Sequence, residues 1–259
     1  AAAAQWLDAE DATMRQVLAW ARDHDADMAL RLAAALGPWW YLRGRLPGQY
    51  PLIRETAERT APGGDAWCTV QLWLGLTAVW SDDPVGALGH FTAVRDAIAD
   101  REPPPALASC LAGRSLALAR LRQVGEAADD GRRALALARE TADPAAEVLV
   151  LVLSAIVALE AGDSGGGLQL ARQARQVTSD IPGWIARASA NIVTDALIGV
   201  GDLAAAERCC AATLALARDA GDLGALPRLL IRMATVDLQT GRIEAATSCL
   251  HEALQMLRD

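Results

Sequence analysis

The sequence contains no lysine, so all 24 of its basic residues are arginine. A Walker-type phosphate loop needs a lysine beside the phosphates, and this segment therefore cannot carry such an ATP site. Acidic residues number 32, which gives a formal net charge of −8. An acidic chain without a basic block is poorly suited to binding phosphate backbones, so we expect no direct nucleic-acid binding by this segment.

Aromatic residues are scarce at 4% of the chain, and alanine and leucine dominate. Strands favour aromatic and β-branched residues, whereas alanine and leucine are strong helix formers, so the composition predicts an all-α protein. No uncharged run reaches the roughly 18 residues that a membrane span requires, and no charged-then-apolar leader opens the chain. The five cysteines are odd in number and lack CxxC spacing. We therefore expect reduced thiols and a cytoplasmic protein.

A repeat of about forty residues is the main signal in the sequence. Apolar helical stretches are separated by turns at six positions in register: Gly44, Asp82, Arg122, Gly162, Gly201 and Gly241. The successive spacings are 38, 40, 40, 39 and 40 residues. The spacing predicts six helix-turn-helix units.

Small residues keep the same register. Seven positions before each turn the residues are Gly37, Gly75, Ser115, Ala155, Thr194 and Ala234. Five positions after the turn, the first unit has Gln49 and the others have Ala87, Ala127, Gly167, Ala206 and Ala246. Because helices approach most closely where side chains are smallest, we expect the two helices of a unit to touch at these positions.

The helical pattern divides the chain into a leading helix over residues 5–22 and a tetratricopeptide-like repeat domain over 23–259. First helices are expected near 25–42, 65–80, 105–121, 144–160, 183–199 and 225–239, and second helices near 47–60, 84–99, 124–140, 165–178, 203–219 and 243–258. Each pair exposes apolar surface that only a neighbouring pair can cover. The expected fold is all-α, a right-handed α-solenoid of about six helix-turn-helix repeats.

The small-residue offsets resemble the tetratricopeptide repeat, although a period near 40 is closer to the lengthened repeats of MalT-type regulators. The opening, DHDADMALRLAAAL from Asp23 and WWYLRGRL from Trp39, is similar to the segment after the nucleotide-binding module in actinobacterial LuxR/AfsR-like signal-transduction ATPases. The resemblance implies a regulator that switches transcription when a ligand or protein is sensed. It implies no catalysis here, because the ATPase and DNA-binding modules would lie outside these residues.

Two short motifs suggest enzymes but lack the required context. The run GDSGG from Gly162 matches the nucleophile signature of trypsin-like proteases, which are β-barrels, and it falls in phase with the other turns. The run HEALQ from His251 misses the zinc-protease motif because Gln255 replaces the second histidine. We therefore expect no catalytic residue, no metal ligand and no cofactor.

The first helices of a tetratricopeptide array line its concave groove. That register places nine candidate binding residues there: Tyr41, Leu72, Leu76, Trp80, Leu116, Arg120, Val152, Ile156 and Asn191. Asp195 and Arg228 lie further along the same set. An exposed apolar strip indicates a partner surface, but the same residues would pack on neighbouring helices if the superhelix were tight, and both readings stay open.

The leading hypothesis is a non-catalytic sensor domain of a transcription regulator, which binds a protein, peptide or small effector in the groove and contacts other modules of its parent. Arg120 would pair with an anionic group of the ligand. The alternative is an oligomerisation or intramolecular docking scaffold without a small ligand, since solenoids expose large faces. A hydrolase or transferase is a third class, disfavoured because no catalytic constellation converges.

Overall fold

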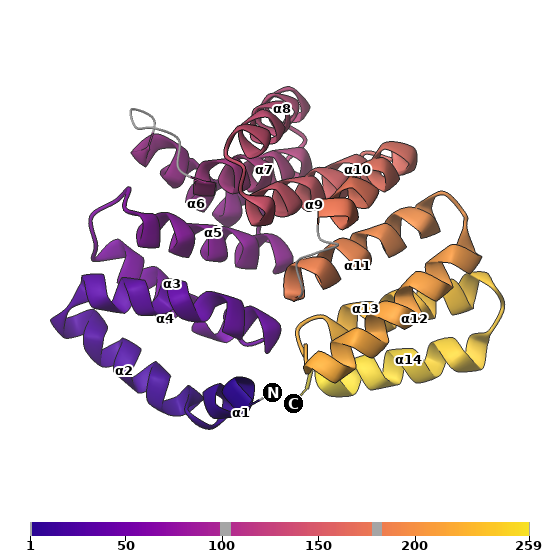
Figure 1. The fold of residues 1–259 in the computed structure, drawn as a ribbon, viewed down its shortest axis with the longest axis horizontal. Helices are drawn as coiled ribbons and strands as arrows, with labels where there is room; N and C mark the ends of the chain where they lie inside the picture. The colour runs from indigo at the N-terminus through magenta and orange to yellow at the C-terminus, as the bar shows by residue number, and fades with distance from the viewer. Residues whose placement is uncertain (1, 99–104, 178–182, 259) are drawn as a thin grey trace.

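The computed structural model describes residues 2–98, 105–177 and 183–258. Every regular element within these ranges is an α-helix (Figure 1). The helices are α1 (Ala2–Ala9), α2 (Asp11–His24), α3 (Ala26–Leu42), α4 (Leu46–Glu58), α5 (Asp65–Trp80), α6 (Pro84–Ala97), α7 (Pro105–Arg120), α8 (Val124–Glu140), α9 (Pro144–Glu160), α10 (Ser164–Val177), α11 (Trp184–Gly199), α12 (Leu203–Ala220), α13 (Leu226–Gln239) and α14 (Ile243–Met256).

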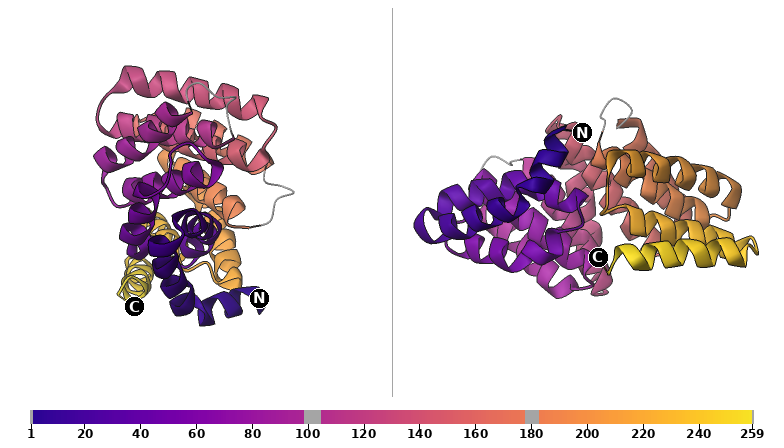
Figure 2. Two further views of the ribbon diagram at one scale, coloured as in Figure 1. Left: turned by 90° about the vertical axis from the view of Figure 1, so that its left-hand side faces the viewer. Right: turned by 90° about the horizontal axis from the view of Figure 1, so that it is seen from below.

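The helices form six consecutive pairs, from α3–α4 to α13–α14, that stack along an arc (Figure 1). One arm holds α1 to α6, the bend holds α7 to α10, and the second arm holds α11 to α14. Two perpendicular views show the same stack from the side and from below (Figure 2). The prediction of an all-α solenoid is confirmed. Residues 99, 178 and 259, at the ends of expected helices or of the repeat domain, lie outside the described residues.

All six expected turns are present, and the residue at each one has a positive φ. The angles are 66° at Gly44, 59° at Asp82, 62° at Arg122, 85° at Gly162, and 80° at both Gly201 and Gly241. This left-handed conformation ends a helix by turning the chain away from the helix axis, and glycine adopts it without steric cost. The forty-residue register therefore marks the point where each first helix stops, including the two positions that lack glycine.

Aspartates begin several of the helices after these turns. Asp83 accepts a hydrogen bond from the backbone nitrogen of Gly86 at 2.8 Å, and Asp163 accepts one from Gly166 at 2.8 Å. Asp202 does the same for Ala205 at 3.1 Å. Each carboxylate satisfies an amide that the first helical turn leaves free. The GDSGG run thus forms a turn and a helix cap between α9 and α10.

The small residues lie where helices meet. Gly75 on α5 and Gly113 on α7 face the buried ring of Phe91 on α6, and a Cβ atom on either glycine would overlap that ring. In the third unit, Ser115 donates a hydrogen bond to the carbonyl of Ala127 at 2.7 Å. Gly75, Ser115 and Ala127 are register positions, so helices approach closely at these three as expected, whereas Gly113 lies outside the register.

The leading helix expected over residues 5–22 is instead two helices, α1 and α2, which separate at Glu10. Asp11 is buried at the start of α2, where it accepts a hydrogen bond from the indole of Trp40 at 3.3 Å. Asp8 on α1 lies 2.6 Å from the guanidinium of Arg43. The chain bends because both carboxylates reach inward to partners at the end of α3.

The arc closes on itself between the end of α3 and the start of the last helix pair. The loop between α12 and α13 touches the end of α3, where the amide of Gly224 donates to the carbonyl of Leu42 at 2.9 Å. Arg43 also donates to the carbonyl of Gly221. A Cβ atom on Gly224 would overlap the Tyr41 carbonyl oxygen, so this close approach requires glycine. We call these four residues, Leu42, Arg43, Gly221 and Gly224, the closing contact.

Candidate functional site

The arc surrounds a partly enclosed central cavity of about 230 Å³. All six first helices, α3, α5, α7, α9, α11 and α13, contribute to its wall, so the cavity exists only in the assembled solenoid. Its lining residues are Tyr41, Leu76, Trp80, Arg120, Leu149, Val152, Leu153, Ile156, Glu160, Ala188, Asn191, Ile192, Asp195, Arg228 and Arg232. Seven of these fifteen residues are aliphatic, and the charged and amide side chains come from α7 and α9 as well as from α11 and α13. A cavity of this kind suits an apolar group that carries a polar end.

Seven of the nine candidate residues lie around this cavity: Tyr41, Leu76, Trp80, Arg120, Val152, Ile156 and Asn191. Trp80 is 42% exposed, whereas most of the aliphatic residues among them are buried against neighbouring helices as well as facing the cavity. The apolar strip therefore lines a cavity, as expected for a groove, and also packs against neighbouring helices, as expected for a tight superhelix.

Two candidate residues lie elsewhere. Leu116 is completely buried in the core, so it cannot contact a ligand in the cavity. Leu72 lines a different surface depression, between α5, α7 and α9. One residue of register error turns a helical position by about 100°, which is enough to move a side chain from the groove into the core.

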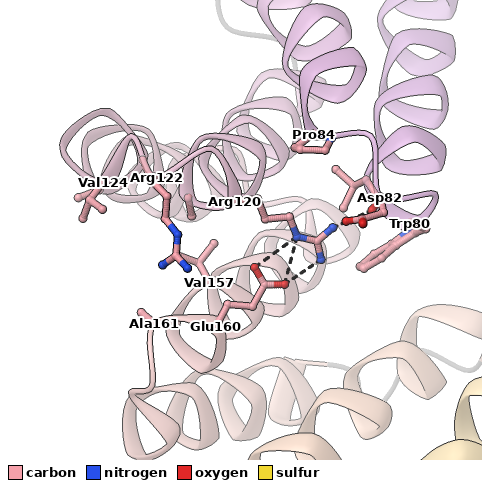
Figure 3. A pocket seen from close by; sticks show the side chains of 13 residues that line it. Trp80, Asp82, Pro84, Arg120, Arg122, Val124, Val157, Glu160 and Ala161 are labelled. Atoms are coloured by element: carbon pink, nitrogen blue, oxygen red, sulfur yellow. Dashed lines mark hydrogen bonds and ion pairs between the residues drawn. The ribbon is translucent and has the colours of Figure 1, made fainter.

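Arg120 does not offer a free charge to a ligand, contrary to the sequence-based expectation. Its Nη2 and Nε atoms lie 2.8 and 3.2 Å from Oε1 of Glu160, and its Nη1 donates to the carbonyl of Val79 at 2.7 Å. Figure 3 shows this arginine between Glu160 and Trp80, with Arg122 on the far side of Val157. Arg120 therefore ties α5, α7 and α9 together, and Glu160 neutralises it.

The second arm supplies two further arginines. Arg232 forms a two-pronged ion pair with Asp195, with both nitrogen–oxygen distances at 2.5 Å. Arg228 lies over the ring of Tyr41, 5.7 Å from its centroid, and donates to the Tyr41 hydroxyl at 3.3 Å. Sequence reasoning placed Arg228 in the wider groove set but did not single it out, because nothing local distinguishes it from the paired arginines.

Two larger hollows flank the central cavity and share residues with it. One, of about 720 Å³, includes Trp80, Arg120 and Glu160 and is the pocket drawn in Figure 3. The other, of about 750 Å³, includes Tyr41, Trp80 and Arg228 and lies beside the closing contact. Trp80 borders all three. An extended partner could therefore reach the central cavity from either side and pass the same indole ring.

Three titratable side chains away from the cavity, His90, Cys110 and Cys210, are covered by the helices packed around them. His90 accepts from or donates to Tyr50 and Gln71, each at 2.7 Å, and burial lowers its pKa to about 4. Burial raises the pKa of the Cys210 thiol to about 12, and that of Cys110 also rises. Such thiols are poor nucleophiles. Within the described residues, no group of three or more His, Cys, Asp or Glu side chains could hold a metal ion.

Comparisons with known proteins show the fold. At 12% identity, the Rap protein complexed with Competence and Sporulation Factor superposes over 98% of this chain and 76% of its own, with a TM-score of 0.67. A tetratricopeptide repeat protein from Parabacteroides merdae matches at 14% identity over 99% and 94% of the two chains, with a TM-score of 0.56. The fold is a tetratricopeptide-like solenoid.

A third solenoid, BtubC from P. vanneervenii, matches at 14% identity over 83% of this chain and 91% of its own, with a TM-score of 0.58. No family model matches the sequence, and neither does any curated protein. At these identities the comparisons show the shared solenoid architecture alone. Across the described residues, no helix combines the length and apolar character needed to cross a bilayer.

Proposed function

We propose that this chain is a non-catalytic recognition module that binds a segment of a protein or peptide partner in its central cavity. The main support for the proposal is that seven of the nine residues expected in the groove surround the same partly enclosed cavity. Tetratricopeptide-like solenoids typically bind proteins through such concave surfaces. The Rap neighbour, whose structure is a complex with Competence and Sporulation Factor, supports this use of the arc.

We place the module in the cytoplasm, as the sensor part of a transcription regulator of the LuxR/AfsR-like kind. The similarity of the segment from Asp23 to Leu46 supports this context, and so do five free cysteines. The full-length protein is then expected to bind promoter DNA through another module. A variant that fills the cavity should change that binding, and an unchanged promoter affinity would count against the regulator context.

Selection from a displayed library of random peptides tests the binding proposal. Ile156→Trp fills the cavity from α9, and Val85→Trp adds the same ring on the exposed surface of α6 as a matched control. Peptides enriched on the wild type should bind Val85→Trp equally and Ile156→Trp at least tenfold more weakly. Equal binding to all three proteins, or no enrichment at all, would remove the cavity as the binding site. Circular dichroism checks that both variants keep their helices.

A docking or oligomerisation scaffold is the second candidate, and α14 supplies its supporting observation. Exposed aliphatic side chains follow one face of this helix and its end, at Ile243, Leu250, Leu254 and Leu257. This spacing places them on one stripe, which is typical of a helix that packs against another. Light scattering over a concentration series, with Leu254→Glu as the disruptive variant, tests whether the stripe joins two copies.

A further inference from the structure

Polar residues on α11 face polar residues on α13 and in the loop before it, in three successive rungs beside the cavity. The two helices are the first helices of consecutive units and run in the same direction. On α11 the rungs carry Arg187, Asn191 and Asp195, each one turn after the previous one. Opposite them lie Asp222 in the preceding loop and then Arg228 and Arg232 on α13.

The two outer rungs are closed ion pairs. Arg187 lies 2.7 Å from the carboxylate of Asp222, which is almost wholly buried. Asp195 and Arg232 form the two-pronged pair at 2.5 Å. Each outer rung therefore combines one arginine with one carboxylate, so its charge is balanced inside the protein.

The middle rung lacks its carboxylate. Asn191 and Arg228 stand four residues before Asp195 and Arg232, so equal steps along parallel helices keep them opposite each other. Asn191 is only 6% exposed and lines the cavity, and no donor within the described part of the chain reaches its Oδ1 atom. Arg228 contacts the ring and the hydroxyl of Tyr41. None of the ion pairs found among the described residues includes Arg228. The rung keeps an uncompensated positive charge and an unsatisfied buried acceptor.

We infer that the middle rung binds a ligand that carries a carboxylate, an adjacent N–H donor and a compact aliphatic body. The carboxylate pairs with the Arg228 guanidinium, which has the fork geometry for two parallel hydrogen bonds. The N–H donates to Oδ1 of Asn191, and the body lies against Leu76, Val152 and Ile156. An N-acylated amino acid and the last residue of a peptide share this chemistry. The inference rests on the proposed use of the central cavity for binding.

Calorimetry with defined probes tests this chemistry and separates the two sources. The probes are N-acetyl-L-leucine, its uncharged amide, and acetyl-Gly-Gly-Leu with a free carboxylate. Both carboxylates should bind the wild type at least tenfold more tightly than the amide. Tighter binding of the tripeptide identifies a peptide end as the source, and tighter binding of the acetyl amino acid identifies a small molecule. If no probe binds, or if the amide binds as well as the acids, the inference is wrong.

Two substitutions test the rung itself. Asn191→Asp places a carboxylate opposite Arg228, so it should raise the melting temperature and abolish binding of both acidic probes. Arg228→Gln should weaken their binding at least tenfold. Arg218→Gln, which opens an exposed pair with Glu252 on the outer surface, is the matched control and should bind like the wild type. Wild-type affinity in Asn191→Asp would overturn the assignment.

The outcome can be separated from that of the proposed function. Displayed peptides that lose affinity for Ile156→Trp but keep it for both rung variants would leave the cavity as the binding site and remove the rung as its anion-binding group. Loss of the acidic probes from the rung variants, together with unchanged peptide binding to Ile156→Trp, would place a small carboxylate at the rung and the displayed peptides elsewhere.

Discussion

The two arms of the arc hold their helices together in different ways. In the first arm, glycines on α5 and on α7 at the bend receive the ring of Phe91, and Gly37 receives the indole of Trp73. After Phe91 the sequence has a single further Phe, Trp or Tyr residue, Trp184. In the second arm, arginine–carboxylate pairs link consecutive units. Glycine–aromatic packing thus distinguishes the first arm, and arginine–carboxylate pairs between α11 and α13 or its preceding loop distinguish the second, although both arms have an apolar core and the first arm has ion pairs of its own.

This difference indicates which arm of the molecule can change its contacts when a ligand binds. Close-packed rings have one arrangement, and changing their volume is costly. In the row of charges on the second arm, Arg228 stands between two closed ion pairs without a carboxylate of its own among the described residues, so an incoming carboxylate can pair with it. The binding chemistry inferred above accordingly lies on the second arm, while Trp80 and the aliphatic residues of α5 and α9 supply a fixed wall.

The largest effect is expected from Phe91→Ala, which empties the glycine-lined space of the first arm. A buried Phe→Ala change costs about 4 kcal/mol because it removes apolar contacts and leaves a cavity. Urea unfolding followed by circular dichroism measures the loss. Val85→Ala, on the exposed side of the same helix, should stay within about 0.5 kcal/mol of the wild type. A small loss for Phe91→Ala would mean that shape complementarity does not hold this arm.

Asp222→Ala is the corresponding change in the second arm. It leaves the largely covered Arg187 side chain, 12% exposed, without its carboxylate and removes a hydrogen bond to the amide of Ala225, so we expect a loss of about 3 kcal/mol. Glu252→Ala breaks the exposed pair with Arg218 and should cost less than about 0.5 kcal/mol. Equal losses for the two variants would show that burial of the ion pair does not matter here.

The first arm also contains a buried titrating group, which makes its stability depend on pH. The pKa of His90 is about 4 in the folded protein against an ordinary 6.5, mainly because burial disfavours the charged ring. As the pH falls, His90 takes up its proton at a higher pH in the unfolded chain than in the folded protein. The stability that comes from keeping this ring neutral is therefore fully present above pH 6.5 and is lost as the pH falls towards 4. We expect a loss of about 2 kcal/mol across this window. Urea unfolding at several pH values measures it.

His90→Gln removes the titrating ring while keeping a side chain that can bond to Tyr50 and Gln71. This variant should show a flatter dependence of unfolding free energy on pH between 4 and 6.5. His251→Gln, on the exposed face of α14, should keep the wild-type slope. A slope that His90→Gln leaves unchanged would assign the acid sensitivity to other groups.

The smallest expected effect is a difference in stability between substitutions at two of the turns. Gly201 and Arg122 occupy equivalent positions with φ of 80° and 62°. Gly201→Ala introduces a Cβ atom into the left-handed conformation and should cost about 1 kcal/mol. Arg122→Ala should change stability by less than about 0.5 kcal/mol, because arginine already carries a Cβ atom there. Thermal melting of the two variants side by side measures the difference, and equal shifts would contradict the turn assignment.

The repeat register predicted the helices, turns and contact points because each depends on residues close in the chain. Positive φ at Asp82 and Arg122 follows from spacing alone, without any glycine to mark it. The site was harder to predict. Leu116 was expected in the groove but lies in the core, because the sequence pattern fixes the rotation of a helix only to within about one residue. Arg120 was expected to face a ligand, but Glu160, forty residues further along the chain, neutralises it. The break at Glu10 depends on Trp40 and Arg43, which no local pattern links to it.

The hydrogen bond from Gly224 to Leu42 has a consequence for folding. In an open array, stability spreads only between adjacent repeats, and either end can fray without disturbing the other. Here the first repeat touches the loop before the last, so the two termini share one cooperative unit. Deleting α1 and α2, which hold Arg43 through Asp8, should therefore increase amide hydrogen exchange in α13 at the opposite end of the chain.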